Sequence, residues 1–338
     1  MEGTELRSIA IVIGLLTVAA ICGAVDAKEL TLYSGRSKSL VEPIIKQFEN
    51  ETQIKVKVRY GGTAELAVAL LEEGENSPAD LFWAQDAGAL GTISKHGLFQ
   101  QLPDTIPSRV PEKFRDSGGM WVATSGRARV IAYSSDQIKA EDVPNSILDL
   151  TDPKWKGGVG WAPQNASFQA FVTAMRVGVG EEKTEEWLRG MKANDTKSYA
   201  KNTPIIKALA AGEIELGLPN HYYLLRFKKT DSKFPVDQVF FKSGDPGNLV
   251  NVAGIGHLKT SRNTEEALTL IQFLLSAQAQ QYFAGEVFEY PITNKAVPHP
   301  NPKLVPLAEL LERTPSINLG ALDDLDGTLK LLRKVGIL

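Results

Sequence analysis

Two hydrophobic periods alternate along the first part of the chain. Residues 40–52 and 64–74 carry apolar side chains at the spacing of helices that bury one face, with Gly74 as a C-cap and Pro43 expected in a first helical turn. Residues 54–60 alternate apolar and polar side chains, which predicts a half-buried strand. Short apolar runs at 29–34 and 80–84 predict two more strands. This strand–helix order predicts an α/β fold with parallel pairing.

The second part of the chain repeats this mixture. Residues 128–134 predict one longer strand and residues 158–163 another, followed by helices at 168–178 and 184–192. Residues 265–284 predict a single amphipathic helix, and the Pro-rich residues 290–307 predict a surface connection. A chain of this length exceeds a usual single core, so we expect two lobes.

The first 27 residues resemble an export signal. Arg7 precedes a long apolar run, and small residues lead up to Ala27, after which we expect cleavage. A retained membrane anchor is the alternative interpretation. The bulky Ile21 disfavours lipid attachment at Cys22. Cys22 is the only cysteine in the sequence, so the exported chain would form no disulfide and would offer no thiolate to a metal.

The charge of the exported chain is close to neutral. Removing Arg7 leaves 36 basic residues, and removing Glu2, Glu5 and Asp26 leaves 37 acidic ones, a net charge of −1. This balance gives no reason to expect nucleic acid or anionic lipid as a partner. No further long apolar run follows, so the exported part is expected to be soluble.

Catalytic motifs are absent from the sequence. It contains no G-x-S-x-G, H-E-x-x-H or G-x-x-x-x-G-K-[ST] pattern. The histidines are far apart, lack metal-ligand spacing, and are expected to be surface or cap residues: His96, His221, His257 and His299.

The adjacent tyrosines Tyr222 and Tyr223 pose the main question. One interpretation places one ring in the core and the other at its rim. The other makes both phenolates ligands of one hard, highly charged cation, because a phenol with a pKa of about 10 ionises at neutral pH only beside strong positive charge. Ferric ion is such a cation, and it accepts oxygen ligands where cysteine is absent. The residues alone leave both interpretations open.

Several segments together resemble the ferric-iron-binding periplasmic proteins of ABC importers, in the type II periplasmic-binding-protein family. They occur in one order along the chain: "LYSGRS", "EEGENSPADLFWAQDAGAL", "SGRARVIAYS", "LTDPKWKGGVGWAP", "YAKN", "NHYYLLRF", "GDPGNLVN" and "LLSAQAQQYFAGEVFEYPI". The resemblance implies an α/β fold of two lobes, each a central mixed sheet flanked by helices, which close on a ligand in the cleft. The lobes are expected at residues 28–127 plus about 251–303, and at residues 128–250 plus about 304–338.

The resemblance also implies a binding site. Tyr222 and Tyr223 match the family's iron ligands, and a helix start in "PQNASF" matches its site for a synergistic anion, carbonate or phosphate. A simple N-cap is the alternative for that helix start. The cleft or anion residues that we predict are Arg36, Ser37, Gln85, Arg127, Asn165, Ala166, Ser167, Asn202 and Asn220.

This chain departs from the family pattern at three of these positions. Ser37 stands where many members have a ligand, Gln85 aligns with a ligand glutamate, and Asn165 replaces a third tyrosine of some members. The anion and water would then complete the coordination, with Arg36 and Arg127 as planar anion clamps.

The sequence thus predicts an extracytoplasmic, monomeric receptor that captures ferric ion with a small anion and delivers it to an ABC permease. A receptor for an oxyanion or small organic anion without iron is the alternative. A secreted α/β enzyme is a more distant one, since a fold does not fix a function.

Overall fold

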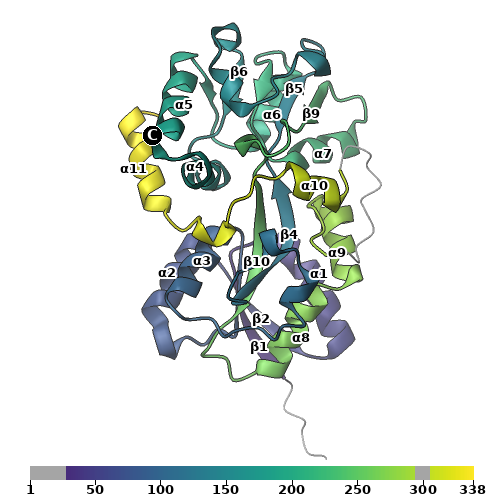
Figure 1. Cartoon of the computed structure of the whole chain (residues 1–338). Coiled ribbons are helices and arrows are strands. Elements are labelled where there is room, and N and C mark those ends of the chain that lie inside the picture. The colour runs from purple at the N-terminus through teal and green to yellow at the C-terminus, as the bar shows by residue number, and fades with distance from the viewer. Residues whose placement is uncertain (1–27, 294–304) are drawn as a thin grey trace, which may run out of the picture.

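The computed structural model describes residues 28–293 and 305–338. The predicted export signal and His299 lie outside the described residues, as does most of the Pro-rich connection. Two lobes, each built on its own five-stranded sheet, lie one above the other (Figure 1). Within the described ranges, we find no helix with the length and apolar character needed to cross a bilayer.

The first lobe is built on a mixed sheet of order β2-β1-β3-β10-β4. Strand β1 pairs in parallel with β2 and β3, whereas β10 is antiparallel to β3 and β4. Its strands are β1 (Glu29–Ser34), β2 (Lys55–Tyr60), β3 (Leu81–Ala84), β4 (Trp121–Ala128) and β10 (Val250–His257). Its helices are α1 (Lys38–Thr52), α2 (Thr63–Glu73), α3 (Ala87–Lys95), α8 (Thr264–Leu274) and α9 (Ala277–Tyr282).

The second lobe has a mixed sheet of order β7-β6-β8-β5-β9. Strand β6 is parallel to β7 and β8, and β5 is antiparallel to β8 and β9. Its strands are β5 (Ile131–Ser134), β6 (Val159–Trp161), β7 (Lys197–Ser198), β8 (Leu216–Gly217) and β9 (Val236–Val239). Its helices are α4 (Ala166–Val179), α5 (Glu181–Ala193), α6 (Asn202–Ala210) and α7 (His221–Thr230).

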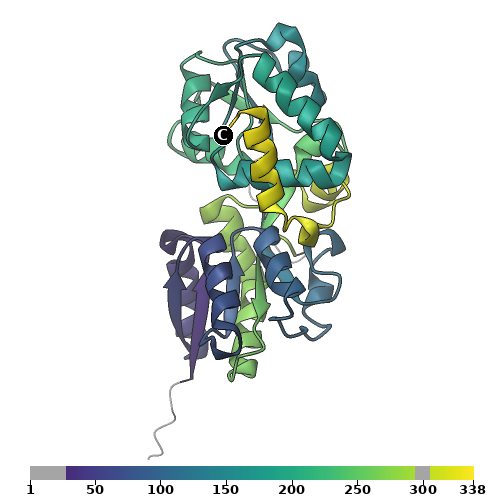
Figure 2. The same cartoon turned by 90° about the vertical axis from the view of Figure 1, so that its left-hand side faces the viewer.

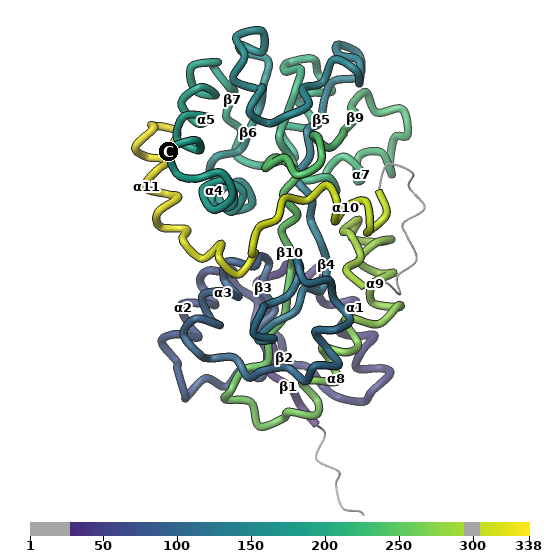
Figure 3. Tube along the Cα trace, in the orientation of Figure 1, coloured from purple at the N-terminus to yellow at the C-terminus, as the bar shows by residue number. Residues whose placement is uncertain are grey.

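The C-terminal segment contacts both lobes. After α10 (Leu307–Arg313), a short 3₁₀ helix (Leu319–Ala321) packs on α3, and α11 (Leu325–Val335) packs on α4 and α5. Figures 1 and 3 show this yellow segment passing between the lobes, and Figure 2 shows α11 on the side face of the molecule. Gly88 and Gly91 share one face of α3, where a Cβ would collide with the carbonyl oxygens of Leu322 and Gly320.

The predicted α/β architecture with two mixed sheets is confirmed, and each lobe has a buried apolar core. The predicted long strand at 128–134 is wrong, because β4 ends at Ala128 in the first sheet and β5 begins at Ile131 in the second. The single helix predicted at 265–284 is also wrong, because Ser276 caps a new helix by accepting a hydrogen bond from the Ala279 N–H. The predicted division of the chain into lobes by residue number stays a prediction.

Helix α1 differs from expectation at Pro43. The helix begins at Lys38, so Pro43 lies in its second turn instead of its first. A proline there cannot bond the carbonyl of Ser39, and the helix forgoes that one hydrogen bond. The buried face of Val41, Ile44, Ile45 and Phe48 holds the helix on the sheet.

Candidate functional site

The two tyrosines lie in the first turn of α7. Asn220 precedes the helix with an extended backbone, and its side chain makes no capping bond. The rings of Tyr222 and Tyr223 are stacked, with centroids 4.4 Å apart and planes 28° apart. Tyr222 is buried and Tyr223 is half-buried, and the guanidinium of Arg226 lies 4.9 Å from the Tyr222 ring. The helix therefore presents two phenols side by side.

The surroundings of Tyr222 keep its phenol neutral in the metal-free protein. Burial raises the pKa of Tyr222 above its usual value, and the adjacent Tyr223 raises it further. The positive charge of Arg127 acts in the opposite direction. Ionisation of this phenol at neutral pH therefore requires a further strong positive charge.

His221 anchors the start of α7 to both neighbouring segments. Its Nδ1 accepts a hydrogen bond from the Ala128 N–H at 3.2 Å, and its Nε2 lies 2.8 Å from the Phe288 carbonyl oxygen, to which it donates. Burial lowers the pKa of His221 to about 4, so the ring is neutral at pH 7. The expectation of a surface or cap residue is wrong for His221 and also for His257, since both are buried.

The start of α4 brings together three of the predicted polar residues. Asn165 caps the helix, its Oδ1 accepting from the Ser167 N–H at 3.0 Å and from the Ser167 hydroxyl at 2.6 Å. Asn202, at the start of α6, directs its Nδ2 at the same hydroxyl, 3.4 Å away. The Asn202 Oδ1 is buried without a hydrogen-bond partner, whereas Ala166 is exposed. Asn165 thus caps α4, and among the described residues the buried Asn202 Oδ1 beside it has no donor. The anion role of this turn stays a prediction.

Arg129 is the site residue that sequence reasoning missed. It lies between β4 and β5, only 2% exposed, and donates to the Leu218 carbonyl at 2.5 Å and the Ser167 carbonyl at 2.8 Å. Burial lowers the pKa of Arg129 to about 10, and negative charge on the Tyr222 and Tyr223 phenols, once they ionise, would raise it. It is therefore a buried cation at pH 7, beside the tyrosine pair. Its distance in sequence from Ser167 and Leu218 left no signal for this role.

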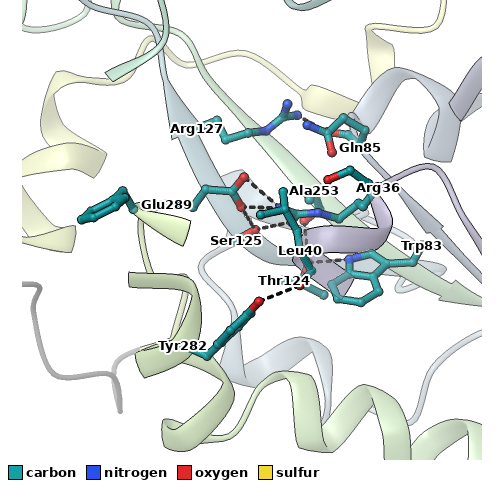
Figure 4. A network of polar contacts seen from close by, with 12 residues as sticks. Arg36, Leu40, Trp83, Gln85, Thr124, Ser125, Arg127, Ala253, Tyr282 and Glu289 are labelled. Carbon is teal, nitrogen blue, oxygen red and sulfur yellow. Dashed lines mark hydrogen bonds and ion pairs between the residues drawn. The ribbon is translucent and has the colours of Figure 1, made fainter. Parts of the chain in front are cut away.

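Arg127 and Gln85 meet where the lobes join. Arg127, near the end of β4, is 4% exposed and donates through Nη2 to the backbone carbonyl of Gln85. Its Nε is buried without a partner, so the guanidinium has unused capacity to donate. Figure 4 shows Arg127 beside Gln85.

Arg36 has a different environment from the one predicted for an anion clamp. Its Nη2 lies 2.8 and 2.9 Å from the two carboxylate oxygens of Glu289, and its Nη1 donates to the Ser125 hydroxyl at 2.8 Å (Figure 4). Burial would raise the pKa of Glu289, but the charges of Arg36 and Arg127 hold it below its usual value. The Arg36 guanidinium is thus committed to a buried ion pair, while Ser37 beside it is exposed.

A cavity of about 550 Å³ is lined by residues of both lobes, but neither Tyr222 nor Tyr223 lines it. Gln85 and Asp86 line it from the first lobe, Ala166 and Ala170 from α4, and Leu322 from the C-terminal segment. Among the described residues, no group of three or more His, Cys, Asp or Glu side chains is placed to hold a metal ion.

Known proteins resemble this chain along most of its length. A family model described as bacterial extracellular solute-binding protein matches residues 76–309. The chain is 33% identical over 330 residues to the major ferric iron-binding protein of Neisseria meningitidis serogroup B, covering 95% of this chain and 97% of that one. It is 32% identical over 311 residues to the Fe(3+)-binding periplasmic protein of Serratia marcescens, covering 91% of each chain.

A solved structure shows the same fold. The crystal structure of iron-bound HitA from Pseudomonas aeruginosa matches with a TM-score of 0.82 and 34% sequence identity, covering 91% of this chain and 99% of that one. The two-lobed binding-protein architecture expected from the sequence is confirmed by this match. The chain belongs to the family of bacterial extracellular solute-binding proteins.

Proposed function

We propose that this protein captures ferric ion together with a small oxyanion, with Tyr222 and Tyr223 as phenolate ligands. Relatives that match nearly its whole length are named for ferric iron binding. Membership of a solute-binding family makes the protein a receptor and not an enzyme. The observation that carries the proposal is the stacked tyrosine pair, with ring centroids 4.4 Å apart, near Arg127, whose Nε has no hydrogen-bond partner among the described residues.

The chemistry of the tyrosine pair supports a trivalent cation. Burial raises the pKa of Tyr222, so a weakly charged ligand leaves this phenol protonated. A ferric ion supplies enough positive charge to displace the protons, and it prefers hard oxygen donors. A neutral organic ligand gains nothing comparable from two neighbouring phenols.

The remaining coordination positions are assigned to a carbonate or phosphate ion and water. Two phenolates leave most of a ferric coordination sphere unfilled, and Ser37, Gln85 and Asn165 replace the ligands of other family members. Arg36 and Arg127 each have a buried Nε without a partner among the described residues, but Glu289 holds the Nη2 of Arg36, so Arg127 is the more available clamp for such an anion. The first turn of α4 contributes its positive helix end.

Delivery follows from the fold class. We assign closure of the lobes over the loaded site, followed by docking on an ABC permease, to a monomer outside the cytoplasmic membrane. Residues 1–27 would direct this export. The periplasmic name of a relative with 32% identity supports the location.

The visible spectrum tests the proposal, because ferric phenolates absorb visible light by charge transfer. Metal-free protein is mixed with ferric citrate, dialysed and scanned, and we expect a visible band together with bound iron. Tyr222→Phe and Tyr223→Phe should each weaken or abolish the band. Tyr199→Phe is the matched control, since this phenol bonds Glu213 at 2.9 Å and should leave the band intact.

The result also separates the alternative functions. Protein that binds phosphate tightly but develops no band with ferric citrate is a receptor for the anion alone. A band of equal strength in both site variants and in the control contradicts the assignment of the tyrosine pair.

A further inference from the structure

Arg129 occupies the short crossing between β4 and β5. Its backbone N–H donates to the Leu249 carbonyl at 2.8 Å, and its backbone forms a bridge to Asn220. Its side chain is buried against Phe168 and Phe171, with guanidinium-to-ring distances of 5.7 and 5.0 Å. This residue is therefore fixed at the point where the chain passes from one lobe to the other.

The guanidinium joins two halves of the proposed site. Its Nη1 donates to the Leu218 carbonyl at 2.5 Å, four residues before Tyr222. Its Nη2 donates to the Ser167 carbonyl at 2.8 Å and faces the Ser167 hydroxyl at 3.3 Å, in the first turn of α4. A planar guanidinium sets the positions of such acceptors together, because its donors have a fixed geometry.

Among the residues that the structure describes, the charge of Arg129 has no acidic partner. Its bonds in the described part of the chain go to carbonyl and hydroxyl oxygens, and no described carboxylate forms an ion pair with it. A buried cation of this kind is costly unless negative charge arrives nearby. The phenols of Tyr222 and Tyr223 and the anion turn are its closest candidates for that charge.

We propose that Arg129 is a positioning residue that couples the anion turn of α4 to the tyrosine pair of α7. The anion raises the affinity for ferric ion, and the size of this increase depends on the Arg129 guanidinium, which bonds both Ser167 and Leu218. This inference rests on the proposed function and deepens it. The described hydrogen bond of the Arg127 side chain is to Gln85, in the first lobe. The Arg129 side chain instead bonds Leu218 and Ser167, and so it connects the tyrosine pair and the anion turn within the second lobe.

The physical argument concerns alignment. An anion that binds both the metal and the α4 turn gains affinity only if the turn and the phenolates keep a fixed separation, to within about 0.5 Å. Without the guanidinium, the Ser167 and Leu218 carbonyls lose a shared donor and the two segments move independently. The binding free energies of the anion and of the ferric ion should then become nearly additive, because neither ligand any longer positions the residues that bind the other.

The test measures anion synergy. Ferric affinity is determined by competition with a hydroxamate chelator, which carries no carboxylate, in degassed buffer with and without saturating inorganic phosphate. The ratio of the two affinities is the synergy. We expect Arg129→Met to reduce this ratio by about tenfold or more, the size expected for losing a charged hydrogen-bonding group. Arg129→Lys keeps the charge but loses the fork, and should also lower the ratio.

The control is Arg176→Met, on α4, the helix whose first turn is the anion turn. Arg176 bonds Asp324 and Thr328 of the C-terminal segment, so its loss perturbs α4 without touching the anion turn. We expect its synergy to equal that of the unmodified protein. A purely structural role for Arg129 would lower both affinities equally and leave the ratio unchanged.

The outcomes separate the inference from the proposed function. If the unmodified protein develops no ferric band, the proposed function fails. If it binds iron equally well with and without phosphate, iron capture by the tyrosine pair stands, but the role of phosphate in it and the coupling role of Arg129 are both overturned. An unchanged ratio in folded Arg129→Met overturns it too. If the Met variant fails to fold, the folded Lys variant decides in the same way.

Discussion

The buried ion pair of Arg36 and Glu289 gives a prediction whose size follows from the structure. The two side chains are 1% and 2% exposed, and the carboxylate accepts from Arg36 at 2.8 and 2.9 Å and from the Ser125 hydroxyl at 2.5 Å. Removing one partner of such a pair leaves an uncompensated buried charge, which costs about 3–5 kcal/mol. We therefore expect Glu289→Gln to lower the free energy of unfolding by that amount.

Replacing both partners should cost much less than replacing one. The double variant Arg36→Met with Glu289→Met removes both charges and fills the space with apolar chains. What remains is the unpaired Ser125 hydroxyl, worth about 1 kcal/mol. Arg36→Met and Glu289→Met made singly should each cost about 3–5 kcal/mol, because each leaves one buried charge unpaired. The coupling between these two substitutions should therefore be about 5 kcal/mol or more.

Urea unfolding provides the assay, followed by tryptophan fluorescence because Trp83 lies 5.5 Å from the Arg36 guanidinium. Lys330→Met serves as a control, because its ion pair with Asp326 is largely exposed and its loss should leave the unfolding midpoint unchanged. Additive costs of the two single substitutions would refute the reasoning, because they would show that the pair does not act as a unit.

Two further predictions concern pH and the C-terminal segment. Glu289 has a lowered pKa in the folded protein, so its contribution to stability is complete above the ordinary carboxyl pKa and is lost as the pH falls through the folded value. The unfolding free energy should therefore change less between pH 7 and pH 4 in Glu289→Gln than in the unmodified protein. An equal change in both proteins would count against a lowered pKa of Glu289 in the folded state. Gly91→Ala places a Cβ against the Gly320 carbonyl and should speed proteolysis of the C-terminal segment, with a cost of about 1–3 kcal/mol. Gly285→Ala is its control, since the nearest atom there lies 3.8 Å away, and equal proteolysis of both variants would exclude the close contact.

Much of the first lobe could be predicted because its elements have unambiguous periods. Strand β2 alternates in sequence and lies at the sheet edge with alternating burial, and α1 buries the face that its spacing predicts. The sequence also indicates the tyrosine pair, because Tyr222 and Tyr223 are the one place where two tyrosines are adjacent in the chain. A helix there brings the two rings together. Local patterns sufficed for these features.

Features that depend on contacts distant in sequence could not be predicted. The run from Ala128 to Ser134 is apolar apart from Arg129 and Ser134, and neither of these residues marks the passage from one sheet to the other. Arg129 gains its role from Ser167 and Leu218, 38 and 89 residues away. His221 carries no sign of burial in its neighbours, because the carbonyl of Phe288 that it bonds lies 67 residues away.

The most direct test of the central claim is a crystal structure of the protein loaded with ferric ion and phosphate, with anomalous scattering recorded at the iron edge. We predict one iron peak within bonding distance of both the Tyr222 and Tyr223 hydroxyl oxygens, with the anion on the same ion. An iron peak elsewhere, or phenol rings packed against hydrocarbon with their hydroxyls far from the metal, would contradict the account.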